Sequence, residues 1–382
     1  MKRPDRFISF SPPLLGEEEI SEVTDTLRSQ WLTTGKKTAK FQEHFSAYCG
    51  SQKAVAMNSC TACLHTALAL LELKAGDEVI APSFTFASTG HTVLYTGARL
   101  VLCDILPDTL TMNPEHFASL ITEHTRAVMP VHYAGHPCEL DEIRSLAKKN
   151  NIIVIEDAAH AAGAEYRGVK IGNTGHAACF SFYATKNLTT AEGGMLTTNN
   201  IDFAEKAARL SMYGISDSRE MAKRYSETGT WEYDIAELGF KYNMPDTAAA
   251  IGIHQLTRLD KFIERRKAHA AIYRSAFKNC RNISLPAERS YVKSAQHLFP
   301  VLFSRSVSRN RIYDELKKHG IGTSVHFKPL HMHTFYKNYF QKNISLPVCE
   351  DVFSRILCLP VSPVHTEDEI NYIAETLTEI AG

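Results

Sequence analysis

Short, uninterrupted runs of apolar residues, separated by amphipathic helices, dominate the first half of the chain and constrain its fold more than any other feature. The runs expected to form strands are 54–57, 78–82, 100–104, 127–132, 152–155 and 177–183. Because these runs do not alternate with polar residues, both faces of each strand should be buried, as in a parallel sheet covered by helices. The sequence therefore predicts an α/β fold with a mostly parallel central sheet.

Ligands of such sheets bind at the carboxyl ends of the strands. The residues that stand at or just beyond the ends of different predicted strands, and that carry useful chemistry, are Ser59, Phe86, His132, Asp157 and Lys186. We expect these residues to lie along one edge of the sheet.

The 382 residues are enough for one large and one smaller domain. We expect a large α/β domain at 1–259 and a small α+β domain at 260–382, the latter entered through a helix at 260–279 that follows a helix at 247–259. Further elements expected in the second domain are strands at 297–303 and 321–327 and helices at 308–319 and 367–380. The polar segment 213–238 reads as a long loop, and loops of that length are usually functional or interfacial.

Composition excludes several classes of partner. Basic and acidic residues each number 42, so no overall charge favours nucleic acid or a membrane surface. No apolar stretch reaches the length of a membrane span, and the basic N-terminus has no apolar region behind it. The nine cysteines form no disulfide-like framework, which suits a reducing compartment. We expect a cytoplasmic protein.

Neither a metal site nor a nicotinamide site is indicated. Cys60 and Cys63 form a single C-x-x-C pair, where a zinc ribbon needs two, and His331 and His333 have no carboxylate or cysteine at ligand spacing. The chain also has no G-x-G-x-x-G string, which a dinucleotide-binding domain places after its first strand.

Lys186 stands in a polar turn directly after a buried strand. Ser181 and Thr185 supply hydroxyl groups nearby, and Gly193 and Gly194 allow backbone to approach a ligand closely. A lysine in such a place is commonly a solvated surface amine. If it is instead desolvated, it can lose its proton near neutral pH and form a Schiff base with an aldehyde.

The residues that follow other predicted strands could bind further parts of a ligand that carries such an aldehyde. Ser59 and Thr61 stand where a strand enters a helix, so they either cap that helix or, with its free N–H groups, bind a phosphate. Asp157 either caps the helix after it or faces the nitrogen of a pyridine ring, for which the small alanines that follow leave room. Phe86 could cover one face of such a ring or simply pack in the core.

Together these strings resemble those of the DegT/DnrJ/EryC1/StrS family of sugar aminotransferases, and the resemblance covers essentially the whole chain. The strings that carry it are Asn58-Ser59-Cys60-Thr61-Ala62, Pro82-Ser83-Phe84-Thr85-Phe86, Val131-His132-Tyr133-Ala134-Gly135, Glu156-Asp157-Ala158-Ala159-His160 and Ser181-Phe182-Tyr183-Ala184-Thr185-Lys186. The resemblance implies a fold-type I enzyme dependent on pyridoxal 5′-phosphate (PLP). The C-terminal strings at 320–327 and 357–360 look most like those of the enzymes that make UDP-4-amino-4-deoxy-L-arabinose for lipid A.

Carried over position by position, the resemblance implies three catalytic residues. Lys186 would form the Schiff base with PLP and later carry a proton, Asp157 would pair with the ring nitrogen, and His160 would sit beside the ring hydroxyl. The residues implied around the phosphate and over the ring are Ser59, Cys60, Thr61, Ser181 and Phe86, the last at a position where the arabinose enzymes carry tryptophan.

The resemblance also implies a homodimer with shared active sites. The family string Gly-Tyr-Asn-Tyr-Arg, which offers an asparagine to the phosphate of the neighbouring subunit, reads Gly239-Phe240-Lys241-Tyr242-Asn243 here. Either Lys241 or Asn243 would then provide the contact.

The implied substrates are a nucleotide-linked (UDP) 4-keto sugar and L-glutamate, which leaves as 2-oxoglutarate. The residues expected to meet the sugar nucleotide are Trp31, Thr33, Lys36, His326 and Lys328. Alternatives are amination at C3, dehydration of a sugar by relatives in which the lysine is replaced, a sensing role, and a PLP-binding module without activity. Lys186 argues against dehydration.

Overall fold

A seven-stranded sheet forms the centre of the structure, a computed structural model that describes residues 6–215 and 233–382. Its strands are β1 (Lys53–Met57), β2 (Glu78–Pro82), β3 (Arg99–Cys103), β4 (Thr125–Val128), β5 (Ile153–Asp157), β8 (Ala177–Ser181) and β9 (Gly194–Thr198). They lie in the order β1-β9-β8-β5-β4-β2-β3, and only β9 runs antiparallel to its two neighbours. The mostly parallel sheet predicted from the continuous apolar runs is confirmed.

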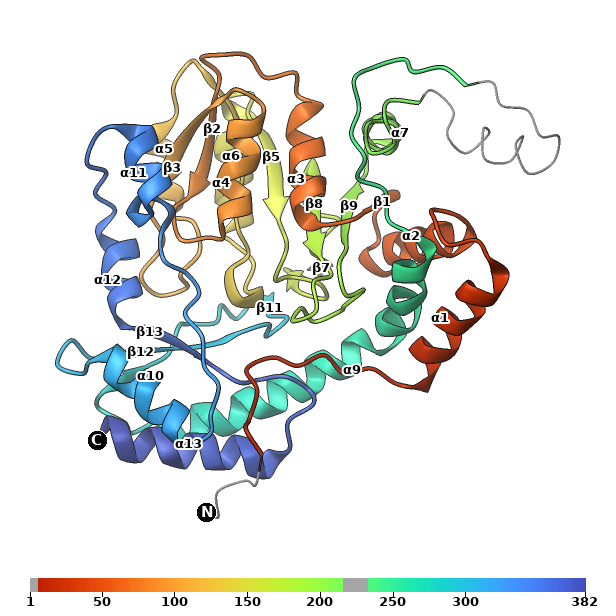
Figure 1. The fold of residues 1–382 in the computed structure, drawn as a ribbon. Coiled ribbons are helices and arrows are strands. Elements are labelled where there is room, and N and C mark those ends of the chain that lie inside the picture. The colour runs from red at the N-terminus through yellow and green to blue at the C-terminus, as the bar shows by residue number, and fades with distance from the viewer. Residues whose placement is uncertain (1–5, 216–232) are drawn as a thin grey trace.

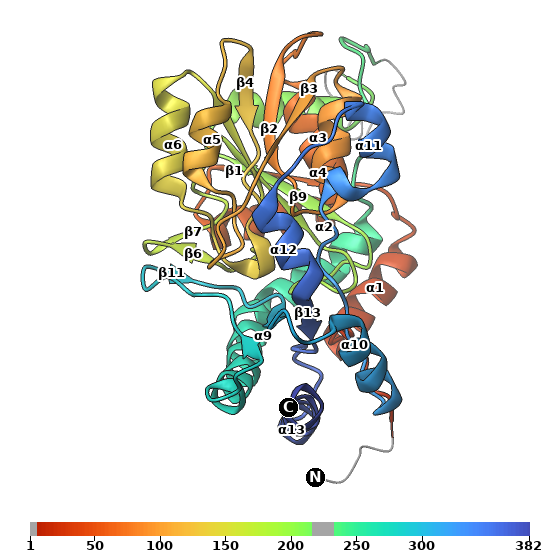
Figure 2. The ribbon, with the colours of Figure 1, turned by 90° about the vertical axis from the view of Figure 1, so that its left-hand side faces the viewer.

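Helices cover both faces of this sheet (Figures 1 and 2). One face packs against the apolar side chains of α3 (Cys60–Ala69), α4 (Ala87–Tyr95) and α7 (Ile201–Leu210). The other face packs against α2 (Lys36–Cys49), α5 (Pro114–Leu120), α6 (Leu140–Lys149) and the first part of α9. Two layers of helices therefore enclose the strands, which explains why the strands contain so few polar residues.

The helix α9 is a single element of 32 residues, Asp246–Phe277, and the two separate helices predicted at 247–259 and 260–279 are wrong. No glycine or proline interrupts the sequence near residue 259, so nothing ends the helix there. Figure 1 shows α9 running from beneath α2 to α13. The proposed division at 259/260 thus falls inside one continuous helix.

A separate apolar core lies at the C-terminal end of the molecule. It combines the last part of α9 with α10 (Arg309–Lys318), α13 (Glu367–Ala381) and the sheet β10 (Ile283–Ser284), β12 (Phe299–Phe303) and β13 (Ile356–Leu359). This core agrees with a second α+β unit. The strand predicted at 321–327 is wrong, because that segment makes only isolated bridges, from Ile321 to Ile8 and from Ser324 to Cys358.

The remaining elements connect these two parts. They are α1 (Glu17–Ser29), η1 (Tyr133–Gly135), η2 (Leu330–Met332), α11 (Thr334–Phe340), α12 (Pro347–Arg355) and the small sheet of β6 (Glu165–Tyr166), β7 (Val169–Lys170) and β11 (Val292–Lys293). The segment at 330–358 packs against the α3 and α4 face of the main sheet. Most of the predicted loop at 213–238 lies outside the described residues. In the described ranges, no helix is long and apolar enough to cross a membrane.

Candidate active site

The carboxyl ends of three strands bring the candidate residues together. Asp157 is the last residue of β5, and the turn that carries Lys186 follows its neighbour β8. The strand β1, on the far side of β9, leads into the first turn of α3. His132 also lies at this edge, since its N–H donates to the carbonyl of Asp157 at 3.1 Å, but its side chain is fully buried, with Nε2 3.0 Å from a carboxylate oxygen of Glu156.

Lys186 occupies a hydrogen-bonded turn. Its backbone N–H donates to the carbonyl of Tyr183 at 2.9 Å, and the hydroxyl of Ser11 donates to the carbonyl of Thr185 at 3.0 Å. Burial lowers the pKa of Lys186 to about 8, although the nearby Cys60 and Asp157 act in the opposite direction. A substantial fraction of this amine is therefore neutral, and hence nucleophilic, slightly above neutral pH.

Asp157 is buried, and its carboxylate is fixed by two donors. The hydroxyl of Thr89 donates to it at 2.7 Å and the N–H of Ala159 at 3.1 Å. Burial raises the pKa of Asp157, while these two hydrogen bonds and the charge of Lys186 lower it. Thr89, which in turn lies 2.8 Å from the hydroxyl of Thr85, was missed in the sequence because it stands inside α4, one turn beyond Phe86.

The first turn of α3 has the features of a phosphate site. Ser59 caps the helix by accepting from the N–H of Ala62 at 3.1 Å, so the capping interpretation of this residue holds. Within residues 6–215 and 233–382, the N–H groups of Cys60 and Thr61 have no backbone acceptor, since a helix leaves its first donors unpaired. They lie at the positive end of the helix dipole and suit an anion.

Gly194 brings β9 against this helix start. A Cβ at Gly194 would stand 2.5 Å from the nitrogen of Cys60 and 2.4 Å from the carbonyl carbon of Ser59. Ser181 pairs with Gly194 across β8 and β9, so its hydroxyl is brought to the same place. The residues present therefore fit PLP: an amine, a carboxylate and a phosphate cradle at one edge of the sheet.

A cluster of aromatic rings includes His160, whose pKa is lowered by burial and by the charge of Lys186. The ring of His160 stacks on Phe327 at 5.7 Å between centroids, and its Nδ1 accepts from the N–H of Ala134 at 3.3 Å. Its Nε2 therefore carries the hydrogen, because burial holds the pKa of His160 well below its ordinary value and keeps the ring neutral. Phe86 is 63% exposed and lies 6.1 Å from Phe327, so it does not pack in the core and is free to cover a ligand.

The string at 239–243 lies beside the approach to α3. The N–H of Asn58 donates to the carbonyl of Tyr242 at 2.7 Å, so the string also contacts its own subunit next to the start of α3. Asn243 donates its amide to the hydroxyl of Thr34 at 2.7 Å. Lys241 is exposed, and among the described residues its ammonium contacts the sulfur of Met212 at 3.5 Å and the face of the Tyr213 ring.

The residues expected at the sugar nucleotide fall into two groups. One group, Trp31, Thr33 and Lys36, lies in a segment that is hydrogen-bonded to the start of α9. There, Asp246 accepts from the N–H of Gly35 at 2.8 Å. Trp31 donates its indole N–H to the carbonyl of Thr34 at 3.2 Å, and Lys36 is exposed.

His326 and Lys328 form the second group, and they flank Phe327 in the chain. Lys328 is exposed, as expected of a cation that binds phosphate. His326 stacks on Phe10 at 5.4 Å, and burial, together with the charge of Lys186, lowers its pKa to about 4. His326 is therefore uncharged at neutral pH, and its contact with the sugar nucleotide stays a prediction. Phe10 was missed because nothing in the N-terminal sequence marks its contact with a residue more than 300 positions away.

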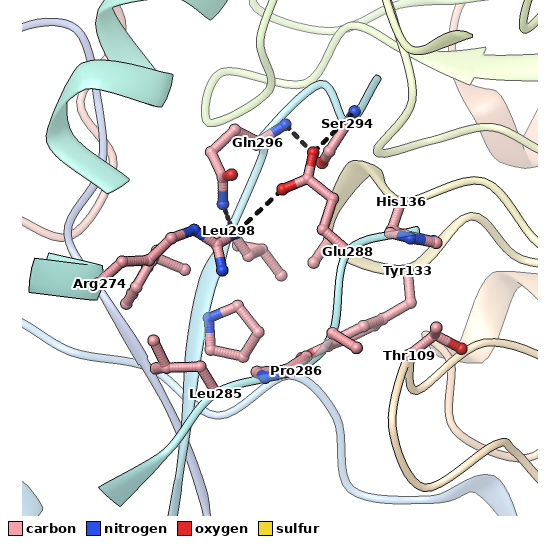
Figure 3. Close-up of a pocket in the computed structure, with 14 residues that line it drawn as sticks. Thr109, Tyr133, His136, Arg274, Leu285, Pro286, Glu288, Ser294, Gln296 and Leu298 are labelled. Carbon is pink, nitrogen blue, oxygen red and sulfur yellow. Dashed lines mark hydrogen bonds and ion pairs between the residues drawn. The ribbon is translucent and has the colours of Figure 1, made fainter. Parts of the chain in front are cut away.

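A pocket elsewhere in the molecule is not this site. Figure 3 shows it between the turn at 133–136 and the segment at 285–300, with Gln296 and Leu298 among its lining residues and an ion pair of 3.1 Å between Arg274 and Glu288. It has about 40 Å³ of room, enough for about one to three waters. PLP does not fit there.

Comparison with known proteins agrees with the geometry. The model of the DegT/DnrJ/EryC1/StrS aminotransferase family matches residues 13–378. The chain belongs to this family. The resemblance and the fold-type I architecture predicted from the sequence are thereby confirmed.

Individual relatives match over nearly their full lengths. The chain is 48% identical to the uncharacterized protein MJ1066 of Methanocaldococcus jannaschii over 98% of both chains. It is 40% identical to the spore coat polysaccharide biosynthesis protein SpsC of Bacillus subtilis, covering all of this chain and 98% of the other. Among solved structures, Spr1654 of Streptococcus pneumoniae, described as a sugar aminotransferase, matches in its PLP form at 35% identity and a TM-score of 0.91, over 98% of both chains. Spr1654 is also known in a PMP form. The protein is a PLP-dependent aminotransferase.

Proposed function

We propose that this aminotransferase transfers the amino group of L-glutamate to a nucleotide-linked keto sugar, giving 2-oxoglutarate and an amino sugar nucleotide. The proposal depends on one observation: Lys186, Asp157 and the unpaired N–H groups in the first turn of α3 lie at the same edge of the sheet. The combination of nucleophilic amine, carboxylate and anion cradle matches the three polar ends of PLP.

Each group has a distinct role in this proposal. When bound, PLP supplies an aldehyde and a ring that accepts electrons from the carbon undergoing proton transfer. Lys186 would bind the cofactor and then move the proton with its free amine, while Asp157 would hold the hydrogen of the ring nitrogen. The phosphate would be held by Ser181 and the first turn of α3, and the Nε2 hydrogen of His160 would face the ring hydroxyl.

The sugar is proposed from the names of the relatives. SpsC serves spore coat polysaccharide biosynthesis and Spr1654 is described as a sugar aminotransferase. We propose a UDP-linked 4-keto sugar, with amination at C3 as the second candidate, and a product used for a surface polysaccharide or lipid A.

Incubating the enzyme with glutamate and a panel of 3-keto and 4-keto sugar nucleotides, with the products identified by mass, distinguishes amination at C4 from amination at C3. No amination of any of them would remove the sugar assignment.

The substrate's diphosphate is proposed to meet Lys328, which is exposed beside the aromatic wall formed by Phe86 and Phe327. Lys328→Ala is expected to raise KM for the sugar nucleotide roughly tenfold, about 1.4 kcal/mol, and to leave the half-reaction with glutamate unchanged. Measuring both half-reactions checks this, with Lys342→Ala, another exposed lysine, as the matched control. An equal loss in both half-reactions would contradict the assignment.

The active unit is proposed to be a homodimer in which Lys241 reaches the partner's phosphate. Lys241 is the better candidate because Asn243 already hydrogen-bonds Thr34 of its own subunit. Lys241→Ala is expected to weaken PLP binding by roughly tenfold or more, the usual cost of losing a hydrogen bond to a charged group.

Mixing Lys186→Ala subunits with Lys241→Ala subunits tests the sharing. A mixed dimer should contain one site with both its own Lys186 and a borrowed Lys241, and should regain activity at limiting PLP. Asn243→Ala subunits in place of Lys241→Ala serve as the control. If the mixture gains nothing over the separate variants, or if a monomer is fully active in sedimentation, the sharing is excluded.

A further inference from the structure

His297 and Asn187 form a buried contact that joins the C-terminal half of the chain to the turn carrying Lys186. The Nδ1 of His297 lies 3.0 Å from the Oδ1 of Asn187, and the amide of Asn187 donates to the carbonyl of Ala295 at 2.7 Å. Both side chains are almost completely buried. Because Asn187 presents its oxygen, the hydrogen of the neutral imidazole must stand on Nδ1.

The backbone of His297 is held in place from two directions. Its N–H donates to the carbonyl of Ala134 at 2.9 Å, and its carbonyl accepts from Arg266 of α9 at 3.2 Å. Its neighbours Gln296 and Leu298 line the pocket of Figure 3, whereas His297 is not one of the lining residues, and its ring lies 4.4 Å from that of His160. His297 is thus a fixed point against which another group can be positioned.

We propose that the pair of His297 and Asn187 is a positioning device that holds the turn of Lys186 so that the amine stays directed into the site. Asn187 follows Lys186 directly in the chain, and its side chain is anchored at both its oxygen and its nitrogen. The inference rests on the role of Lys186 proposed above, but it concerns how the amine is held.

Removing the imidazole would leave the Oδ1 of Asn187 buried without a donor, which is unfavourable. The amide can escape this cost by rotating, and the turn then loses its anchor. Lys186 would become better solvated, and its pKa would rise from about 8 towards the ordinary 10.5.

The pKa of Lys186 is a suitable reporter because His297 carries no charge to lose. Burial and the neighbouring His160 keep the pKa of His297 well below its ordinary value. The groups that act on Lys186 itself are Cys60 and Asp157, and neither belongs to the pair.

The test measures the pH dependence of acetylation of Lys186 in the full-length, cofactor-free protein, read by mass. His297→Leu and Asn187→Ala are each expected to raise the midpoint, the pH at which acetylation is half-maximal, by about one pH unit or more. The double variant should raise this midpoint by no more than either single variant does. His297→Asn restores a donor where Nδ1 stood and should return the midpoint towards the wild-type value. With PLP bound, kcat of the glutamate half-reaction should fall roughly tenfold in His297→Leu, since a small misplacement of a reacting group is costly.

His269→Asn is the matched control, because His269 is an equally buried histidine, on α9, with no hydrogen bond to the turn. An unchanged midpoint in both His297→Leu and Asn187→Ala would overturn the proposal, as would a His297→Asn protein that behaves like His297→Leu. Asn187→Ala alone decides the matter if His297→Leu does not fold. If Lys186→Ala kept transaminase activity, the role proposed for Lys186 would fail instead, and the acetylation midpoints would still report the pairing of His297 with Asn187.

Discussion

Replacing Lys186 with alanine is expected to abolish transamination, lowering kcat by more than about 10⁴-fold, the upper range for a positioned proton-transfer group. The variant loses both the nucleophile that binds PLP and the amine that moves the proton. It should still fold, because burying an ammonium opposes folding, and removing it relieves that cost. It should also still bind PLP through Asp157 and the first turn of α3. Product formation from glutamate and a keto sugar nucleotide, followed by mass, measures the loss.

Lys318→Ala is the control for this change, since Lys318 is exposed and pairs with Glu315 on the surface of α10. It should retain full activity. A Lys186→Ala protein that turned over at the rate of the control would show that another residue carries the chemistry. A variant that failed to bind PLP at all would instead show that the carboxylate and phosphate contacts are too weak to hold it alone.

The sheet and its edge could be predicted from the sequence because their signals are local. Continuous apolar runs mark strands buried on both faces, and the rule of carboxyl ends then selects Asp157, Lys186 and Ser59 without any contact map. The wrong division of α9 arose because no local signal in the sequence marks a helix that continues. Charged residues after Leu259 suggested a new element, whereas helix continuity depends on the absence of a breaker.

Contacts between distant segments could not be predicted in this way. Thr89 meets Asp157 across 68 positions, and Asn187 meets His297 across 110. The burial of His326 could not be predicted for the same reason, since its contact with Phe10 becomes visible only when the N-terminal segment is folded over it. Residue type and spacing indicated which groups could do chemistry, but burial determined which of them are charged.

Asp157→Asn is expected to keep the shape of the site and remove its negative charge. An asparagine can still accept from the N–H of Ala159 and can donate to the hydroxyl of Thr89, so the side chain should stay in place. Without the carboxylate, the hydrogen of the PLP ring nitrogen is no longer stabilised, and kcat should fall by roughly 10²–10³-fold, as for other losses of a preorganised electrostatic contact. Single-turnover rates with glutamate measure this step directly.

The Asp157→Asn substitution should also lower the pKa of Lys186. Asp157 raises the pKa of Lys186, so the neutral asparagine should move the acetylation midpoint of Lys186 below about 8 in the cofactor-free protein. Asp141→Asn provides the control, because Asp141 is exposed, pairs with Arg167 and is not among the groups that act on Lys186. It should change neither the rate nor the midpoint. A normal kcat in Asp157→Asn protein free of the parent would exclude the ring-nitrogen role, and a midpoint that rose would show that the carboxylate does not act on Lys186 through its charge.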